Sequence, residues 1–145
     1  MSNDYKKLFP EIVTLRENVI HDAHRNGYTQ TYLGRKRKLQ SINSTWQAEM
    51  EKEERRAFNS AIQSSCADFL KIAAFRCYDE FKDMGVRCAF TVFDSFLLEV
   101  PEDMKEEDML RVADRMSDFS DIVPEFKLRY DWSVGSNWKE CQDKA

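Results

Sequence analysis

Apolar residues recur with a helical period over three stretches of the chain, residues 10–26, 48–83 and 104–119. The first stretch begins with a proline, and Gly27 after it suits the left-handed residue at a helix end. The second stretch contains no Gly or Pro and is followed by Gly85. These features predict three α-helices, the second of them long. On the third helix we expect three apolar residues to point inward, namely Leu110, Ala113 and Met116.

Two apolar runs close together predict a tight hairpin. Residues 86–92 alternate between apolar and polar side chains, and a second apolar run covers residues 96–100. Only Phe93, Asp94 and Ser95 separate the two runs. We therefore expect two antiparallel strands joined at a tip that carries a carboxylate.

A third strand is predicted near the C-terminus. Residues 126–134 alternate strictly between apolar and polar side chains, which is typical of a strand half buried on an antiparallel sheet. Residues 28–39 predict a further short, basic hairpin. The order of elements indicates an α+β fold, in which a small antiparallel sheet, formed by the tight hairpin and the C-terminal strand, packs on long helices. We expect residues 1–145 to form a single domain.

Composition and charge narrow the class of protein. The chain has 145 residues, 42% of them hydrophobic, which is too many for a disordered chain. It has no apolar run near the ~18 residues of a membrane span and no apolar N-terminal leader, so we expect a soluble, intracellular (cytoplasmic) protein without a membrane partner. The net charge is −4, yet residues 25–38 hold five cations and no Asp or Glu. This asymmetry is compatible with one side that faces nucleic acid.

Four short motifs follow one another along the chain. They are Gly27-Tyr28…Thr31…Gly34-Arg35…Arg37, then Glu54-Arg55…Asn59…Gln63…Ala67-Asp68…Lys71, then Val92-Phe93-Asp94-Ser95…Glu99-Val100, and finally Gly135…Asn137-Trp138. In this order they resemble the C-terminal palm segment of the family A DNA polymerases, the family of bacterial DNA polymerase I. The resemblance covers about residues 5–138 and implies a polymerase palm-like fold.

The third motif resembles motif C of this family, whose usual form is Val-His-Asp-Glu. The resemblance implies that Asp94 is catalytic and binds Mg²⁺ in a two-metal site for nucleotidyl transfer. Phe93 stands where the family has a His near the primer end, which implies a DNA contact. Ser95 replaces the usual Glu, so one carboxylate is lost. An ordinary turn aspartate is the alternative reading of Asp94.

Further residues are implied to contact DNA. Arg55, Asn59 and Gln63 recur every four residues and so share one stripe of the long helix. Such side chains can reach minor-groove acceptors, which every correct base pair presents. Arg35 and Arg37 would meet backbone phosphates, which position DNA without reading its sequence. The alternatives are a solvated helix face and a solubilising hairpin.

The resemblance does not include several motifs and domains that family A polymerases have. Motifs A and B would precede this segment, and nothing before Tyr5 could hold them; the fingers, thumb and exonuclease are also missing. One aspartate cannot form a two-metal site, so we expect a complementary chain to supply the rest. The leading hypothesis is the C-terminal subunit of a split, phage-type DNA-directed DNA polymerase. It would be inactive without that partner, and would act on primer–template DNA and deoxynucleoside triphosphates.

Two alternatives belong to other classes of protein. The first is a non-catalytic palm remnant that binds DNA or a replication protein, and the Phe-Asp-Ser tip supports it. The second is an interaction module that has kept only the fold. His21 and His24 form a His-x-x-His pair on the first helix, but no third ligand has matching spacing, so we expect surface histidines.

Overall fold

A computed structural model describes residues 7–144, with side chains up to residue 142. The chain divides into two compact units, Met1–Asp68 and Phe69–Ala145. The α+β class predicted from the sequence is confirmed, because helices carry two separate two-stranded antiparallel sheets. The boundary between the units lies within the long helix α3 (Gln47–Phe81).

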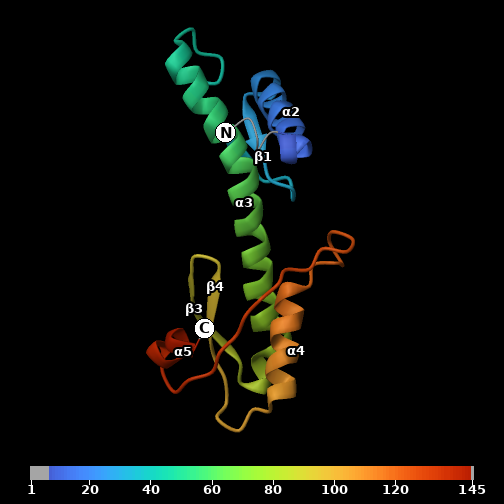
Figure 1. Cartoon of the computed structure of the whole chain (residues 1–145), viewed down its shortest axis with the longest axis vertical. Coiled ribbons are helices and arrows are strands. Elements are labelled where there is room, and N and C mark those ends of the chain that lie inside the picture. The colour runs from blue at the N-terminus through green and yellow to red at the C-terminus, as the bar shows by residue number, and fades with distance from the viewer. Residues whose placement is uncertain (1–6, 145) are drawn as a thin grey trace. The chain divides into compact units, whose positions relative to one another are not determined.

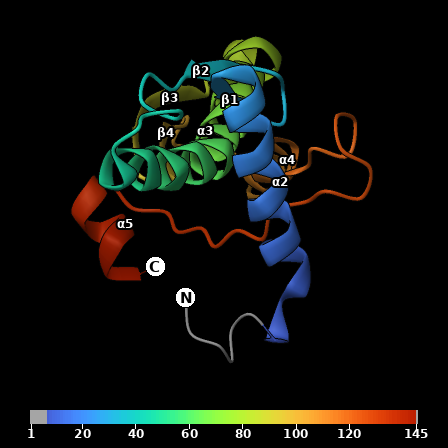
Figure 2. The same cartoon turned by 90° about the horizontal axis from the view of Figure 1, so that it is seen from above.

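The Met1–Asp68 unit consists of α2 (Pro10–Asn26), the strands β1 (Tyr28–Gln30) and β2 (Lys36–Lys38), and the first part of α3. Figures 1 and 2 show α2 and the hairpin alongside this part of α3. Gly27 ends α2 with a φ of 74°, and its N–H donates to the carbonyl of Ala23 at 2.8 Å. A small core joins the three parts, formed by Ala23, Leu39, Ile42 and Ala57.

The Phe69–Ala145 unit contains the rest of α3, a 3₁₀ turn at Lys82–Met84, β3 (Arg87–Val92), β4 (Ser95–Glu99), α4 (Glu106–Ser117) and α5 (Trp138–Lys144). Figure 1 shows α4 beside the second half of α3. The core of the unit is larger and draws on α3, α4 and the segments that flank them: Phe69, Ala73, Cys77, Phe81, Val86, Val112, Met116 and Phe119. The β3–β4 hairpin runs from the pair Arg87 and Glu99 to the pair Val92 and Ser95, with a bulge between Cys88 and Phe90.

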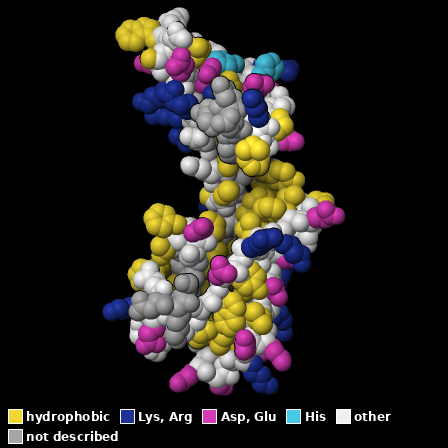
Figure 3. All heavy atoms as spheres, in the orientation of Figure 1, with side chains coloured by type: hydrophobic (Ala, Val, Ile, Leu, Met, Phe, Trp, Pro, Cys, Tyr) yellow, Lys and Arg dark blue, Asp and Glu magenta, His cyan; other side chains and the backbone are white. Residues whose placement is uncertain are grey.

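The predicted C-terminal strand over residues 126–134 is wrong. Within residues 7–144 this segment makes only one isolated bridge, between Asp118 and Lys127. A strand forms only where its backbone groups pair with those of a neighbouring strand, and residues 126–134 pair with neither strand of the β3–β4 sheet. The alternating side chains of Leu128, Tyr130 and Trp132 therefore stay 37–45% exposed. Figure 3 shows hydrophobic side chains at the surface of this unit.

The inward faces of the helices differ in detail from the expected ones. On α4, Val112 is the most buried residue at 1% exposure, and Met116 follows at 7%. Leu110 and Ala113, which we expected to point inward, are half-buried. No helix in residues 7–144 is both long and apolar enough to cross a membrane.

Candidate nucleic-acid interface

Asp94 lies at the tip of the β3–β4 hairpin. Val92 pairs with Ser95, so Phe93 and Asp94 alone form the turn, one residue shorter than predicted. The Asp94 carboxylate is exposed. Phe93 has a positive φ of 55° and a side chain that is 94% exposed. The tip thus presents a carboxylate and an aromatic ring to solvent on a support held by two paired strands.

The tip offers one metal ligand and no complete metal centre. Within residues 7–142, whose side chains the structure describes, no cluster of three or more His, Cys, Asp or Glu is placed to hold a metal ion. A lone carboxylate suits Mg²⁺ only as part of a larger set, because this ion takes its remaining ligands from further carboxylates, substrate phosphates and water. The residues present therefore do not by themselves fit a two-metal site.

Arg55, Asn59 and Gln63 lie on α3 in the Met1–Asp68 unit, and all three side chains are exposed. Their spacing of four residues keeps them on one stripe of the helix. The neighbouring face of the helix is buried, as Ala57 shows with 0% exposure. The stripe is thus free to meet a ligand with three hydrogen-bonding side chains.

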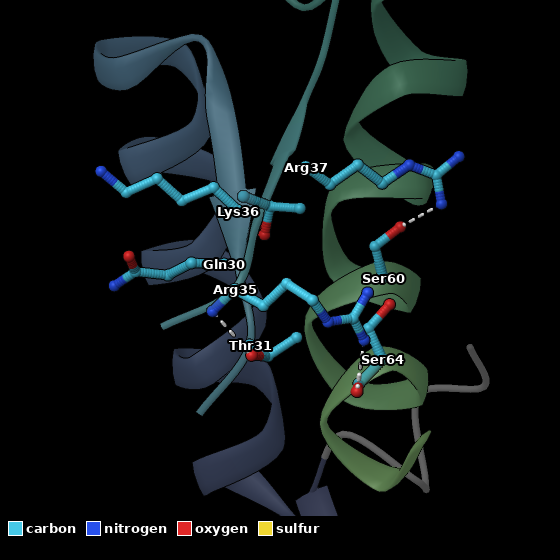
Figure 4. A pocket seen from close by; sticks show the side chains of 8 residues that line it. Gln30, Thr31, Arg35, Lys36, Arg37, Ser60 and Ser64 are labelled. Carbon is cyan, nitrogen blue, oxygen red and sulfur yellow. Dashed lines mark hydrogen bonds between the residues drawn. The ribbon is translucent and has the colours of Figure 1, made fainter. Parts of the chain in front are cut away.

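The basic hairpin is fastened to α3 by its two arginines. The Arg35 guanidinium donates to Asp68 Oδ1 at 2.8 Å and to the carbonyl of Ser64 at 3.0 Å. Arg37 donates to the hydroxyl of Ser60 at 2.8 Å. These bonds hold β2 against the helix, and Figure 4 shows both arginine side chains directed toward α3. Arg35 therefore has a structural partner that the sequence analysis did not assign.

The residues that receive the hairpin were missed in the sequence analysis. Ser60, Ser64 and Asp68 are spaced four residues apart and form a polar stripe along α3. Asp68 is only 8% exposed and Ser60 only 5%. A polar stripe on a helix between apolar positions was the available signal, because buried polar groups need partners and here those partners are arginines.

Both ring nitrogens of His24 have hydrogen-bond partners, so His24 is not the free surface histidine that we expected. Its Nδ1 lies 2.9 Å from Asn43 Oδ1, and its Nε2 lies 2.9 Å from Glu54 Oε1 on α3. The Asn43 amide nitrogen donates to the carbonyl of His24, which leaves Oδ1 as an acceptor. Because both ring nitrogens face acceptors, the doubly protonated ring fits best, and the bonds to Asn43 and Glu54 raise the pKa of His24.

The C-terminal motif forms a helix start. The Asn137 side-chain oxygen accepts the N–H of Glu140 at 3.1 Å, and the Glu140 carboxylate accepts the N–H of Ser136 at 3.1 Å. This reciprocal pattern caps the first turn of α5. A side chain at Gly135 would lie 2.7 Å from the Glu140 Cβ, so glycine is required there. Trp138 packs edge-on against Phe90 of β3, with ring centres 5.3 Å apart.

Comparison with known proteins identifies the class. A sequence model of DNA polymerase family A matches residues 1–140. The thermostable DNA polymerase I of Thermus filiformis is 32% identical over 139 residues, which are 95% of this chain and 16% of that protein. DNA polymerase I of Borreliella burgdorferi is 32% identical over 140 residues, which are 95% of this chain and 15% of that protein.

Comparison of the fold with solved structures agrees with the sequence comparisons. The polymerase domain of Pol1 from M. smegmatis, solved with DNA primer–template and dNTP, matches with a TM-score of 0.71 and 32% identity, over 77% of this chain and 20% of that one. The chain thus has the fold of one part of a family A polymerase domain. It belongs to DNA polymerase family A, and spans about a sixth of the length of the curated relatives named here.

Proposed function

We propose that this chain is the C-terminal palm part of a DNA-directed DNA polymerase, and that both of its units serve that one domain. The single observation that carries the proposal is the position of Asp94 at an exposed, two-residue hairpin tip in a chain of family A. In this function Asp94 would be one ligand for Mg²⁺, and the ion would supply charge stabilisation for phosphoryl transfer once another segment completed its ligand set. Phe93, beside it, contacts the primer terminus.

The exposed stripe on α3 would bind the primer–template duplex. Arg55, Asn59 and Gln63 present donors that match minor-groove acceptors shared by all base pairs. Contacts of this kind hold any sequence equally well, as template-directed synthesis requires. The basic hairpin adds a contact to the DNA backbone through Arg37, while Arg35 holds the hairpin against α3.

A second polypeptide segment would complete the reaction centre. The described residues hold one suitable carboxylate at the tip, and the two-metal reaction needs a second acid and a nucleotide-binding element. We propose that a complementary chain carrying motifs A and B supplies them, so that the chain is inactive alone. The alternating residues Leu128, Tyr130 and Trp132 support such a partner, because they form a row of large apolar side chains that stay 37–45% exposed.

The test is primer extension by the assembly that co-purifies with the tagged chain. Omitting either component, or Mg²⁺, should abolish extension. Asp94→Asn should lower extension by a factor of about 10³ or more, since it removes a metal ligand. Asp83→Asn, at another exposed aspartate of the same unit, is the matched control and should leave the rate unchanged. Full activity of the Asp94→Asn assembly would remove Asp94 from the chemistry.

One observation favours a second candidate function, a palm remnant that binds DNA without catalysis. Ser95 follows Asp94 at the tip, so the tip itself carries a single carboxylate. This candidate predicts salt-sensitive DNA binding by the chain alone and no co-purifying polymerase segment. Alanine at Arg55 and Gln63 should weaken that binding, whereas alanine at the neighbouring Arg56, which pairs with Glu53, should not.

A further inference from the structure

A small pocket lies between the β1–β2 hairpin and α3, inside the Met1–Asp68 unit (Figure 4). Its volume is about 210 Å³. The residues that line it are three cationic residues, four with hydroxyl groups and one with an amide, and none of them is Asp or Glu. Three of the hydroxyl-bearing residues, Thr29, Thr31 and Ser60, are each only 5% exposed. The pocket is therefore a built, donor-rich hollow that suits an anion.

Its size selects a single anionic group over a whole nucleotide. Sites that enclose a complete small molecule measure roughly 300–1,000 Å³, and a water molecule takes up about 30 Å³. A volume of about 210 Å³ has room for one phosphate group with a few waters, but not for a base and sugar as well. An anion that is one unit of a polymer lying across the opening meets this requirement.

The three cations of the lining are not equivalent. Arg35 already pairs with Asp68 and with the carbonyl of Ser64, so its charge is balanced and it holds the hairpin in place. Arg37 bonds to the neutral hydroxyl of Ser60, and no carboxylate among the side chains described, those of residues 7–142, forms an ion pair with it. Lys36 points away from α3, on the opposite side of the hairpin, and its Nζ lies 4.4 Å from the ring centre of Tyr28 (Figure 4).

The hydroxyl groups have protons to offer. Thr31 Oγ1 accepts the N–H of Arg35 at 3.1 Å, and Ser60 Oγ accepts from Arg37 at 2.8 Å. Because each hydroxyl carries one proton besides its acceptor lone pairs, both groups can still donate to an anion. A guanidinium suits such a site because its planar fork bonds two oxygens of a phosphate at once.

We propose that this pocket binds one phosphodiester group of the DNA backbone, with Arg37 as its charged ligand and the buried hydroxyls of Thr31 and Ser60 as its neutral donors. The proposal rests on the DNA-binding function proposed above and narrows it. Arg35 becomes a positioning residue, which acts through Asp68 and does not touch the DNA. The site anchors the duplex without reading its sequence.

The experiment compares neighbouring cations on opposite sides of one strand. Binding of a fluorescent primer–template duplex to the full chain is measured by anisotropy across a salt series. Arg37→Gln should reduce the slope of log K against log salt by about 0.9, and weaken binding about eightfold at 0.1 M salt, as expected for one lost phosphate contact. Lys36→Gln removes the same charge and should change the slope by less than half as much. Equal effects of the two variants would overturn the proposal.

Two further arms guard against loss of structure and against a different ligand. Arg37→Lys keeps the charge and so controls for any loosening of the hairpin in Arg37→Gln. The slope for Arg37→Lys should match that of the unchanged chain, while its affinity falls severalfold because the planar guanidinium is lost. If Arg37→Lys binds the duplex with unchanged affinity, the proposed contact of the Arg37 guanidinium with two phosphate oxygens is overturned. Millimolar deoxynucleoside triphosphate should not compete for the site. Competition that disappears in Arg37→Gln would assign the pocket to the nucleotide and overturn the proposal.

The outcomes separate this site from the polymerase function. If primer extension depends on Asp94 while Arg37→Gln and Lys36→Gln have equal slopes, the pocket proposal fails and the polymerase proposal stands. If Arg37→Gln alone lowers the slope while no assembly extends a primer, the phosphate site stands and the catalytic proposal fails.

Discussion

Phe93 combines two features that oppose stability. Its φ of 55° lies in the left-handed region, and its ring is 94% exposed, so burial returns almost nothing. The left-handed conformation costs a residue with a Cβ about 1–2 kcal/mol. Glycine avoids this cost but loses about 0.5–1 kcal/mol through its greater freedom in the unfolded chain. Phe93→Gly should therefore stabilise the Phe69–Ala145 unit by about 0.75 kcal/mol, the middle of a range from about 0 to 1.5 kcal/mol. Phe93→Ala, which removes the ring but keeps the Cβ, should not.

The assay is urea unfolding followed by tryptophan fluorescence. In a Trp46→Phe background only Trp132 and Trp138 report, and both belong to the unit that carries the hairpin. With a denaturant dependence of about 2 kcal/mol/M, Phe93→Gly should raise the midpoint by about 0.3–0.5 M relative to Phe93→Ala. If the Phe93→Gly variant is no more stable than the Phe93→Ala variant, the assignment of backbone strain to Phe93 is refuted. Both variants should extend primers more slowly in the assembly, since strain retained at an exposed position points to a contact made by the ring.

Three other predictions test single contacts that stabilise the fold. Because the folded pKa of His24 is raised, its stabilisation should be complete below about pH 6.5 and fade as pH rises through that pKa; His24→Gln should flatten this dependence in urea unfolding. Lys127 holds the pKa of Asp118 well below its usual range, so Lys127→Gln should reduce the loss of stability in acid, seen by thermal unfolding below about pH 4. Phe119→Ala, at a 1%-exposed core site, should cost about 3–5 kcal/mol in calorimetry.

The helices were predictable because single residues, through their own backbone preferences, determine where each helix begins or ends. Pro10 at the start of α2, Gly27 at its end and Gly85 after the 3₁₀ turn act through their own backbone preferences, and no distant partner is needed. Helix α3 was predicted over residues 48–83 and is found over Gln47–Phe81 for the same reason. That Arg55, Asn59 and Gln63 share one stripe of the helix also follows from their spacing, whereas their exposure depends on how the hairpin packs. Their contact with DNA stays a prediction.

Pairings between distant residues were not predictable. Arg35 was predicted to bind DNA because it belongs to the Gly34-Arg35 motif within a cluster of cations. Its guanidinium donates to Asp68, 33 residues further along the chain. His24 likewise meets Glu54 across 30 residues. Nothing local distinguishes such a cation from a free one. The three-dimensional packing of the hairpin on α3 decides which of the two arginines keeps an unbalanced charge.

The failed strand prediction carries the most information about function. Residues 126–134 have the alternation of a strand with one buried face, and Leu128, Tyr130 and Trp132 on that face are left 45%, 37% and 41% exposed. Phe126, at the start of that face, packs against Phe69 in the core, whereas Leu128, Tyr130 and Trp132 lack the neighbouring strand and the layer beneath it that would bury them. The sequence is therefore suited to an edge that another polypeptide segment covers. The same requirement follows from Asp94, a single carboxylate at the tip of a hairpin whose proposed chemistry needs two acids.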